Sequence, residues 1–592
     1  MVFQDFDVIQ ERRRQERQRK FKKRITIVVI AIFILLIITG AGIFVVVTSV
    51  KKNEEKAQPA KGKPSHSPPN EVVRNSDKII KTICNSTLYQ DTCQSTLQKI
   101  VKDSPAAKSH PKDLLKGAIS AIADKLEKAF TNVSKLEFAT PEAKQAFEVC
   151  KQVVADAKEE LQTSVDNIGD NLGKLETNGN VNSWLSAVMS YQESCVDAFP
   201  EGKLKSNMKV AFNASQELTS NTLAIVKLLS SFISSVSQTS GANRHLLRSG
   251  SHDVVENGLP TWMNRDERRM LKGDIDKPTP NVTVAKDGTG NFTTINDALA
   301  AMPTKYEGRF VIFVKAGIYE EYVNITKQMV NVTLYGDGSQ KSIITGNKNK
   351  VDGVNTYLTA TVAVMGEGFL GQAMGFRNTA GPEKEQAVAL RVQADRAIFL
   401  NCRFEGYQDT LYVQTHRQFY RSCVIAGTVD FIFGDATALF QNCLIYVRKP
   451  LENQQNAVTA QGRVDKFQTT GIVLQNCKIL PDDSLAPVKA QFKTYLGRPW
   501  KKYSRTIIME STIEDLIDPA GWLAWSGTFA LDTLFYAEFN NEGPGAKRDG
   551  RVKWPGLKTI TKEQAEKFTV GPFLQGAWIN DTGASVHFGL FK

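Results

Sequence analysis

Histidine and cysteine are scarce in this chain of 592 residues, which has six histidines and eight cysteines. No CxxC pair is present, and no group of His, Cys and acidic residues has the spacing of a zinc site. We therefore expect neither a metal ion nor a cofactor. The motif G-x-S-x-G is also missing, which argues against a serine hydrolase of the α/β type.

Positive charge is in excess, but little of that excess lies in the body of the chain. The formal net charge is +12, and residues 11–24 alone hold nine Lys/Arg against two Glu. From Lys272 onward, 36 basic side chains face 32 acidic ones. This distribution argues against a nucleic-acid partner, which would need a basic patch on a folded surface. The length itself predicts at least two domains.

A membrane segment is predicted near the N-terminus. Residues 25–50 run without a charge, which is long enough to cross about 30 Å of hydrocarbon. The basic tail at 1–24 should stay in the cytoplasm, so the rest of the chain should enter the secretory lumen. The apolar run is longer than that of a cleaved signal peptide, which favours a signal-anchor.

Glycosylation motifs agree with this topology. Eight N-x-Ser/Thr sequons follow the apolar run and none precedes it, as expected for a luminal chain in which disulfides also form. The candidate glycosylation sites are Asn85, Asn132, Asn213, Asn281, Asn291, Asn324, Asn331 and Asn580.

Two zones follow the membrane segment. Residues 51–74 are rich in Lys, Pro and Ser and are predicted to be a linker. Residues 75–235 contain only five Gly and four Pro, and their apolar residues recur at three- and four-residue steps, which predicts an all-α helical bundle. Cys84 and Cys93 are close enough for a local disulfide, while Cys150 and Cys195 could join distant helices.

The zone 278–592 has a different character. It holds 29 Gly and many short Val/Ile/Phe/Thr runs, which predict an all-β domain. Four similar segments carry Cys402, Cys423, Cys443 and Cys477, which are 21, 20 and 34 residues apart. A period near 20 with one strand pattern per repeat predicts a parallel β-helix. The cysteines should stack in its core, and Cys423 and Cys443 are a candidate disulfide across adjacent rungs.

The same period brings two aspartates together. Asp409 and Asp430 are 21 residues apart, so they should lie on neighbouring rungs with carboxylates about 5 Å apart. Gln386 and Gln408 should stack in a similar way. Repulsion within the aspartate pair should raise one pKa while the other carboxylate stays ionised, which suits acid/base catalysis.

An alternative is that both aspartates merely cap turns. Both lie within apolar runs that resemble strands, where an unpaired charge is costly. Arg498 is a candidate partner that could hold one aspartate ionised.

Five motifs make the sequence recognisable. Together they resemble the signature set of plant pectin methylesterases, and the resemblance covers about 278–590. The motifs are Gly317-Ile-Tyr-Glu-Glu321, Gln386-Ala-Val-Ala-Leu390, Gly406-Tyr-Gln-Asp-Thr-Leu411, Gly427-Thr-Val-Asp-Phe-Ile-Phe-Gly434 and Leu496-Gly-Arg-Pro-Trp500. Residues 75–235 are similar to the pectin methylesterase inhibitor domain that precedes many of these enzymes, and that resemblance implies a four-helix bundle with the disulfides Cys84–Cys93 and Cys150–Cys195.

The resemblance implies a role for each site residue. Asp430 would be the nucleophile that forms an acyl-enzyme with a methyl-esterified galacturonate, and Asp409 the proton donor and later the base. Gln408, with Gln386, would stabilise the oxyanion, and Arg498 would keep Asp430 ionised. The family's substrate-binding positions match Thr356, Gln386, Arg498 and Trp500. The expected substrate is pectin in the extracellular cell wall.

Processing sites are predicted between the two domains, in the linker 236–277. Arg244-His-Leu-Leu247 and Arg268-Arg-Met-Leu271 look like the basic-plus-leucine sites of these precursors. A protease should release the enzyme after Leu247 or Leu271, and separate inhibitor proteins are possible further partners.

Two other functions remain open from sequence. Polygalacturonases and pectate lyases also use right-handed β-helices, and two carboxylates about 5 Å apart would suit a retaining glycosidase. Alternatively, the helical domain could inhibit other esterases while the β domain only binds pectin. The glutamines and the intact pair of aspartates favour the esterase.

Overall fold

The computed structural model describes residues 79–104, 111–168, 175–237 and 278–592. The expected cytoplasmic tail, membrane segment, linker 51–74 and both processing motifs lie outside these ranges. Among the helices that are described, none combines the length and the apolar character needed to cross a membrane.

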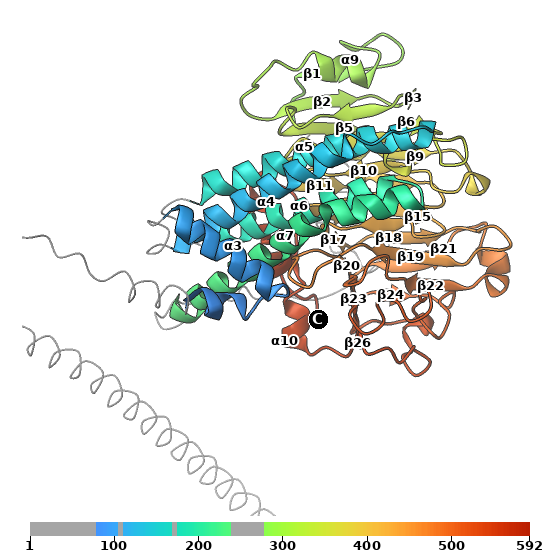
Figure 1. Cartoon of the computed structure of the whole chain (residues 1–592). Helices are drawn as coiled ribbons and strands as arrows, with labels where there is room; N and C mark the ends of the chain where they lie inside the picture. Colours follow the sequence, from blue (N-terminus) through green and yellow to red (C-terminus); the bar gives the residue numbers. More distant parts are fainter. Residues whose placement is uncertain (1–78, 105–110, 169–174, 238–277) are drawn as a thin grey trace, which may run out of the picture. The chain divides into compact units, whose positions relative to one another are not determined.

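The first described part is helical, as expected. Its helices pack through buried apolar residues at three- and four-residue steps, and α5 begins where the Thr140 hydroxyl accepts a hydrogen bond from Ala143 N–H. The labelled helices are α3 (Gln90–Asp103), α4 (Pro111–Val133), α5 (Pro141–Asn167), α6 (Leu175–Ala198) and α7 (Lys203–Ser237) (Figure 1).

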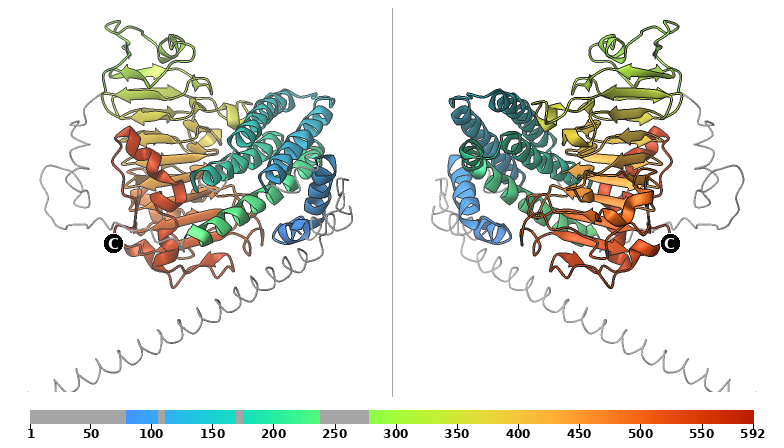
Figure 2. Two further views of the ribbon diagram at one scale, coloured as in Figure 1. Left: turned by 90° about the vertical axis from the view of Figure 1, so that its left-hand side faces the viewer. Right: turned by 90° about the vertical axis from the view of Figure 1, so that its right-hand side faces the viewer.

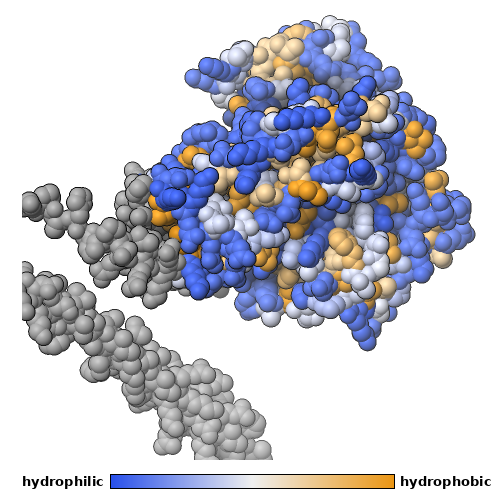
Figure 3. Space-filling model, viewed as in Figure 1, coloured by the Kyte–Doolittle hydropathy of each residue, from blue (hydrophilic) through white to orange (hydrophobic). Residues whose placement is uncertain are grey.

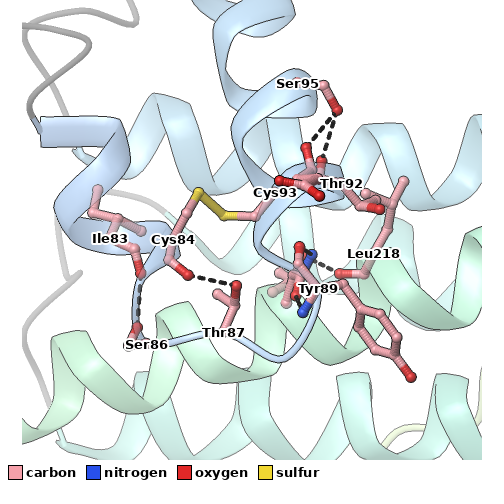
Figure 4. The surroundings of a disulfide bond; sticks show 12 residues. Ile83, Cys84, Ser86, Thr87, Tyr89, Thr92, Cys93, Ser95 and Leu218 are labelled. Carbon is pink, nitrogen blue, oxygen red and sulfur yellow. Dashed lines mark hydrogen bonds between the residues drawn. A yellow bond between two sulfur atoms is a disulfide. The ribbon is translucent and has the colours of Figure 1, made fainter.

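Two disulfides fasten this bundle, and both match the expected pairing. Cys84 bonds to Cys93, which closes the turn before α3 (Figure 4). In that turn the Thr87 hydroxyl donates to the Cys84 carbonyl at 2.7 Å. Cys150 bonds to Cys195 and so joins α5 to α6. The predicted disulfides Cys84–Cys93 and Cys150–Cys195 are therefore confirmed.

Residues 278–592 form the expected parallel β-helix, in which strands stack into three sheets (Figures 1 and 2). The eleven-stranded sheet contains, in order, β1 (Val282–Val284), β2 (Phe310–Val314), β5 (Val332–Gly336), β8 (Leu370–Gln372), β11 (Ala397–Leu400), β14 (Arg417–Arg421), β17 (Thr437–Gln441), β20 (Gly471–Gln475), β23 (Arg505–Met509), β25 (Phe535–Phe539) and β26 (Leu557–Lys558). The seven-stranded sheet contains β22 (Thr494–Gly497), β19 (Asn456–Gln461), β16 (Ile432–Gly434), β13 (Leu411–Val413), β10 (Leu390–Val392), β7 (Val362–Val364) and β4 (Val323–Ile325). The eight-stranded sheet contains β24 (Thr512–Ile513), β21 (Lys478–Pro481), β18 (Leu444–Val447), β15 (Val424–Gly427), β12 (Arg403–Glu405), β9 (Gly375–Asn378), β6 (Ser342–Gly346) and β3 (Gly317–Glu320).

The strand register reproduces the sequence repeat. Arg403 pairs with Val424, which pairs with Leu444, which pairs with Lys478. Each of these residues directly follows one of the repeated cysteines, so each repeat is one rung. The interior is an apolar column in which Phe399, Tyr420 and Phe440 stack with ring centroids 5.0 and 4.4 Å apart.

The predicted disulfide between Cys423 and Cys443 is wrong. Both are free and buried, as are Cys402 and Cys477. The Cys423 thiol donates to the carbonyls of Phe399 and Arg421 at 3.3 Å. Equivalent atoms on successive rungs stand about 4.8 Å apart, whereas a disulfide brings Cβ atoms to about 3.8 Å. These cysteines therefore stack in the core.

Short helices cover one outer face of the β-helix. Val570 and Leu574, on α11 (Val570–Leu574), pack with Leu439 of β17 in a cluster outside the interior column. The preceding helix is α10 (Lys562–Glu566). The face seen in Figure 3 carries mainly hydrophilic residues, with hydrophobic residues interspersed among them, as expected when the large apolar side chains fill the interior.

Candidate active site

The two aspartates occupy equivalent corners of neighbouring rungs. Asp409 comes two residues before β13 and Asp430 two residues before β16, and these strands pair Leu411 with Ile432. The expected stacking is therefore confirmed. The expectation that both aspartates lie within strands is wrong, because each is in a left-handed corner, with φ of 63° and 53°. Such backbone is costly for a residue with a side chain, and it is common at functional sites.

Arg498 holds one of the two carboxylates. Its Nε and Nη2 atoms donate to Oδ1 and Oδ2 of Asp430 at 2.8 and 2.7 Å, a bidentate ion pair. Arg498 follows β22, two rungs beyond Asp430 in the seven-stranded sheet. The sequence-based pairing of this arginine with an aspartate thus has a direct counterpart in the structure.

The electrostatic surroundings of the two aspartates differ. Burial, and then the Asp430 carboxylate, raise the pKa of Asp409 well above its usual value. Burial also raises the pKa of Asp430, but the hydrogen bonds and charge of Arg498 oppose that rise. Asp409 is accordingly the carboxyl suited to hold a proton, and Asp430 the one suited to stay ionised.

All the residues expected at the site line one cavity of about 320 Å³. Thr356 enters from the first turn of a 3₁₀ helix (Thr356–Leu358), and its neighbour Asn355 caps that turn by accepting from Tyr357 N–H. The site residues that meet here are Thr356, Gln386, Gln408, Asp409, Asp430, Arg498 and Trp500.

Aromatic side chains that the sequence did not single out complete the cavity. Tyr412 and Phe433 stack with ring centroids 4.4 Å apart, on adjacent strands β13 and β16. Trp500 meets Phe433 edge-on at 5.9 Å, and the Arg498 guanidinium lies 4.5 Å from the ring centre of the exposed Trp525. One sequence signal could have indicated Tyr412 and Phe433, namely the bulky residue at the outward-facing position of β13 and of β16.

The helical domain supplies one wall of the same cavity. Lys501, beside Trp500, donates to Asp197 Oδ1 at 2.8 Å and to Glu193 Oε2 at 3.0 Å, both on α6. Burial opposes the charge of Lys501, but these two carboxylates raise its pKa above the usual value. The α6 residues at the cavity are Ser194, Asp197 and Ala198. None of them was predicted, because nothing local in the sequence indicates a contact between the domains.

A second charged cluster joins α5 to the β-helix. His416 Nε2 lies 3.4 Å from Glu160 Oε1, and Lys327 lies within 3.4 Å of both Glu160 and Asp156. Burial opposes protonation of His416, but Glu160 and then Asp395 raise the pKa of this imidazole above its usual value. Burial acts against the Glu160 anion, but His416 and Lys327 lower the pKa of Glu160.

Comparison with known proteins adds to this geometry. Residues 281–577 match the family model described as "Pectinesterase", and residues 78–225 match "Plant invertase/pectin methylesterase inhibitor". An Arabidopsis thaliana protein named pectinesterase/pectinesterase inhibitor 45 is 54% identical over 613 residues, which covers 100% of both chains. The relative named pectinesterase/pectinesterase inhibitor 13, from the same plant, is 54% identical over 92% of this chain and 88% of its own.

A solved structure shows the same β-helix. Pectin methylesterase from carrot is 49% identical, with a TM-score of 0.53, and the match covers 54% of this chain and 100% of that one. These matches define a carboxylic ester hydrolase built on a parallel β-helix and preceded by an inhibitor-like helical domain. The chain belongs to the pectinesterase family.

Proposed function

We propose that this chain hydrolyses methyl esters of galacturonate units in cell-wall pectin through an acyl-enzyme on Asp430. The observation that carries this proposal is the bidentate Asp430–Arg498 pair on the rung next to Asp409, in the cavity that also holds Gln386 and Gln408. An ionised carboxylate beside a protonated one is the arrangement that nucleophilic ester cleavage needs.

The reaction follows in two halves. The Asp430 carboxylate attacks the ester carbonyl carbon, and the amides of Gln408 and Gln386 donate to the oxygen that becomes negative. As the carbon–oxygen bond breaks, Asp409 gives its proton to the departing oxygen, which leaves as methanol. Asp409 then takes one proton from water as the water oxygen attacks the acyl carbon. The bond from that carbon to Asp430 breaks, which frees the Asp430 carboxylate and a galacturonic acid that loses its remaining proton to solvent.

Substrate binding is proposed for the residues around these groups. Thr356, Gln386, Arg498 and Trp500 line the same cavity, and Trp500 presents an apolar ring that suits the face of a sugar. Because the core chemistry uses only side chains of this chain, we propose that the reaction needs neither a metal nor a cofactor.

The helical domain is proposed to keep the site closed until it is removed. Its helix α6 lines the catalytic cavity, and the Asn355 amide donates to the Ala198 carbonyl at 2.7 Å. Further hydrogen bonds fix the two domains together, from Gln393 to Asp156 at 2.7 Å and from Ser220 to Asp465 at 2.6 Å. With α6 in place, access of a pectin chain to this cavity would be restricted from that side.

Maturation and location are proposed from the sequence. The apolar segment 25–50 would anchor the precursor in the secretory membrane, and cleavage after Leu247 or Leu271 would release the domain 278–592 into the cell wall, away from the helical domain 75–235. All eight sequon asparagines are exposed, which fits glycosylation in the lumen.

Methanol release from methylated pectin tests the enzymatic proposal. Residues 272–592 should release methanol without creating reducing ends, and Asp430→Ala should abolish that release. New reducing ends would identify a chain-cleaving enzyme instead, and methanol release that survives the substitution would exclude Asp430 as nucleophile. Activity of this fragment would also exclude the alternative in which the β domain only binds pectin.

A further inference from the structure

A second cavity, of about 330 Å³, lies at the other end of α6. Ser183 of α6 borders it, whereas Ala198 of the same helix borders the catalytic cavity. At 1.5 Å per residue these two positions are about 20 Å apart along the helix. The β-helix contributes the first residues of β17 and β23, Thr437 and Arg505. The catalytic aspartates instead precede β13 and β16, so the two cavities are separate.

The charged side chains that line this second cavity are all cationic. No Asp or Glu is among the residues that line it, and its five cationic side chains are Lys227, Arg417, Lys466, Arg505 and Lys567. Arg417 is buried against Asp395. The three lysines are exposed, and within the described residues none of them forms an ion pair. A cleft lined by one sign of charge concentrates ions of the opposite sign.

The cavity also contains hydrogen-bond donors that are held in place but make few hydrogen bonds within the described part of the protein. Arg505 Nη2 donates to the Gln468 carbonyl at 2.9 Å, which fixes the guanidinium and leaves most of its five N–H groups for a ligand. Gly471, on the neighbouring strand β20, makes room for it, because a Cβ there would lie 3.1 Å from Arg505 Cδ. The Ser183 hydroxyl is buried at the cavity and, within the described part of the chain, has no hydrogen-bond partner.

Aromatic rings lie among these cations. Phe467 is half-buried, with the Lys466 and Lys227 ammonium groups 4.9 and 5.9 Å from its ring centre. Phe568 and Phe573 border the same cavity, with ring centroids 6.0 Å apart. A small inorganic anion would use only the cations, whereas an acidic sugar would use the cations for its carboxylates and the rings for its apolar face.

We propose that this cavity binds a de-esterified stretch of galacturonan, the ionised product of the reaction. The choice of galacturonate rests on the proposed function, whereas the preference for an acidic saccharide rests on the cavity itself. Because Ser183 and Lys227 come from the helical domain and Arg505 from the β-helix, the ligand contacts both domains. The uncleaved chain would thus hold demethylated pectin while its catalytic cavity is closed.

Isothermal titration calorimetry of the full chain with a de-esterified oligogalacturonate tests this site. Lys466→Ala/Lys567→Ala should weaken binding about tenfold or more, because two of its cations are lost. The control Lys547→Ala/Lys553→Ala removes the same charge from exposed lysines elsewhere on the β domain. It should leave the affinity unchanged, as should Trp500→Ala in the catalytic cavity. The fully methyl-esterified oligomer should not bind to the unsubstituted chain.

Several results would overturn the assignment. Equal weakening in the control pair would mean diffuse attraction to a basic surface, and weakening by Trp500→Ala would place the oligomer in the catalytic cavity. Inorganic phosphate that displaces the oligomer at equal concentration would identify a small-anion site. Absence of binding to the unsubstituted chain would also refute it. So would unchanged binding by the pocket variant, whose thermal unfolding should match that of the unsubstituted chain. None of these measurements involves turnover, so a failure here is distinguishable from a failure of Asp430→Ala to abolish methanol release.

Discussion

Replacing Arg498 with lysine should shift the acid limb of the pH–activity profile to higher pH. The reaction needs Asp430 ionised, and Arg498 stabilises that anion with two hydrogen bonds, of 2.7 and 2.8 Å. Lysine keeps the positive charge, but its ammonium group can direct only one N–H group at the carboxylate, whereas the arginine guanidinium directs two in parallel. A hydrogen bond to a charged group contributes about 1.5–3 kcal/mol, and about 1.4 kcal/mol corresponds to one pKa unit.

The loss of one such bond should therefore raise the pKa of Asp430 by about one to two units. The measurement is kcat/KM for methanol release across pH, with residues 272–592, the segment whose carrot counterpart is a complete chain. In Arg498→Lys the acid limb should move up by that amount while activity recovers at higher pH, and Arg548→Lys, an exposed control, should change nothing. A lower plateau with an unmoved limb would refute this control of the Asp430 pKa and leave substrate binding as the role of Arg498.

Three further outcomes are expected. Asp197→Ala should raise methanol release by the uncleaved chain, because Lys501 then keeps only Glu193 as a partner and the docking loses one charged hydrogen bond, about 1.5–3 kcal/mol; a precursor that stays inactive would contradict this. His416 has a raised pKa beside Glu160, so its contribution to stability should be complete below about pH 6.5 and lost as pH rises through the folded-state value. Thermal unfolding against pH should show that decline in the native chain and not in His416→Gln. Phe399→Ala should lower the free energy of unfolding by about 3–5 kcal/mol in denaturant titration, because the side chain is fully buried; a loss under about 1 kcal/mol would mean that the column repacks.

The β-helix and the aspartate pair were predictable because a rung repeats its own pattern. Stacked strands present the same positions to the same core, so the spacing of Cys402, Cys423 and Cys443 indicated the period directly. Once the period is known, two residues that are one period apart must lie on adjacent rungs. Asp409 and Asp430 follow from that arithmetic alone, and the register of β13 and β16 confirms it.

Other parts of the site could not be predicted in this way. Lys501 and Asp197 are separated by 304 residues, and their contact depends on how two independently patterned domains dock. The corner conformation of Asp430 was missed because its apolar neighbours resemble a strand, although its φ of 53° excludes one. The failed disulfide has a different cause, since adjacent rungs stand about 4.8 Å apart and a disulfide needs its Cβ atoms at about 3.8 Å, so adjacency alone was not enough.

The charges beside the catalytic cavity support the proposed closure by helix α6. Lys501 lies beside Trp500, at the edge of the cavity, and in this structure its ammonium group is satisfied by Asp197 and Glu193. A pectin chain with demethylated units carries carboxylates of the same kind, so under this proposal the substrate would compete with α6 for one cation. Closure of this kind would depend on Lys501 and would need no additional residue among those that line the catalytic cavity. The proposed cleavage would end this closure, because a free helical domain would have to rebind against the entropy of association.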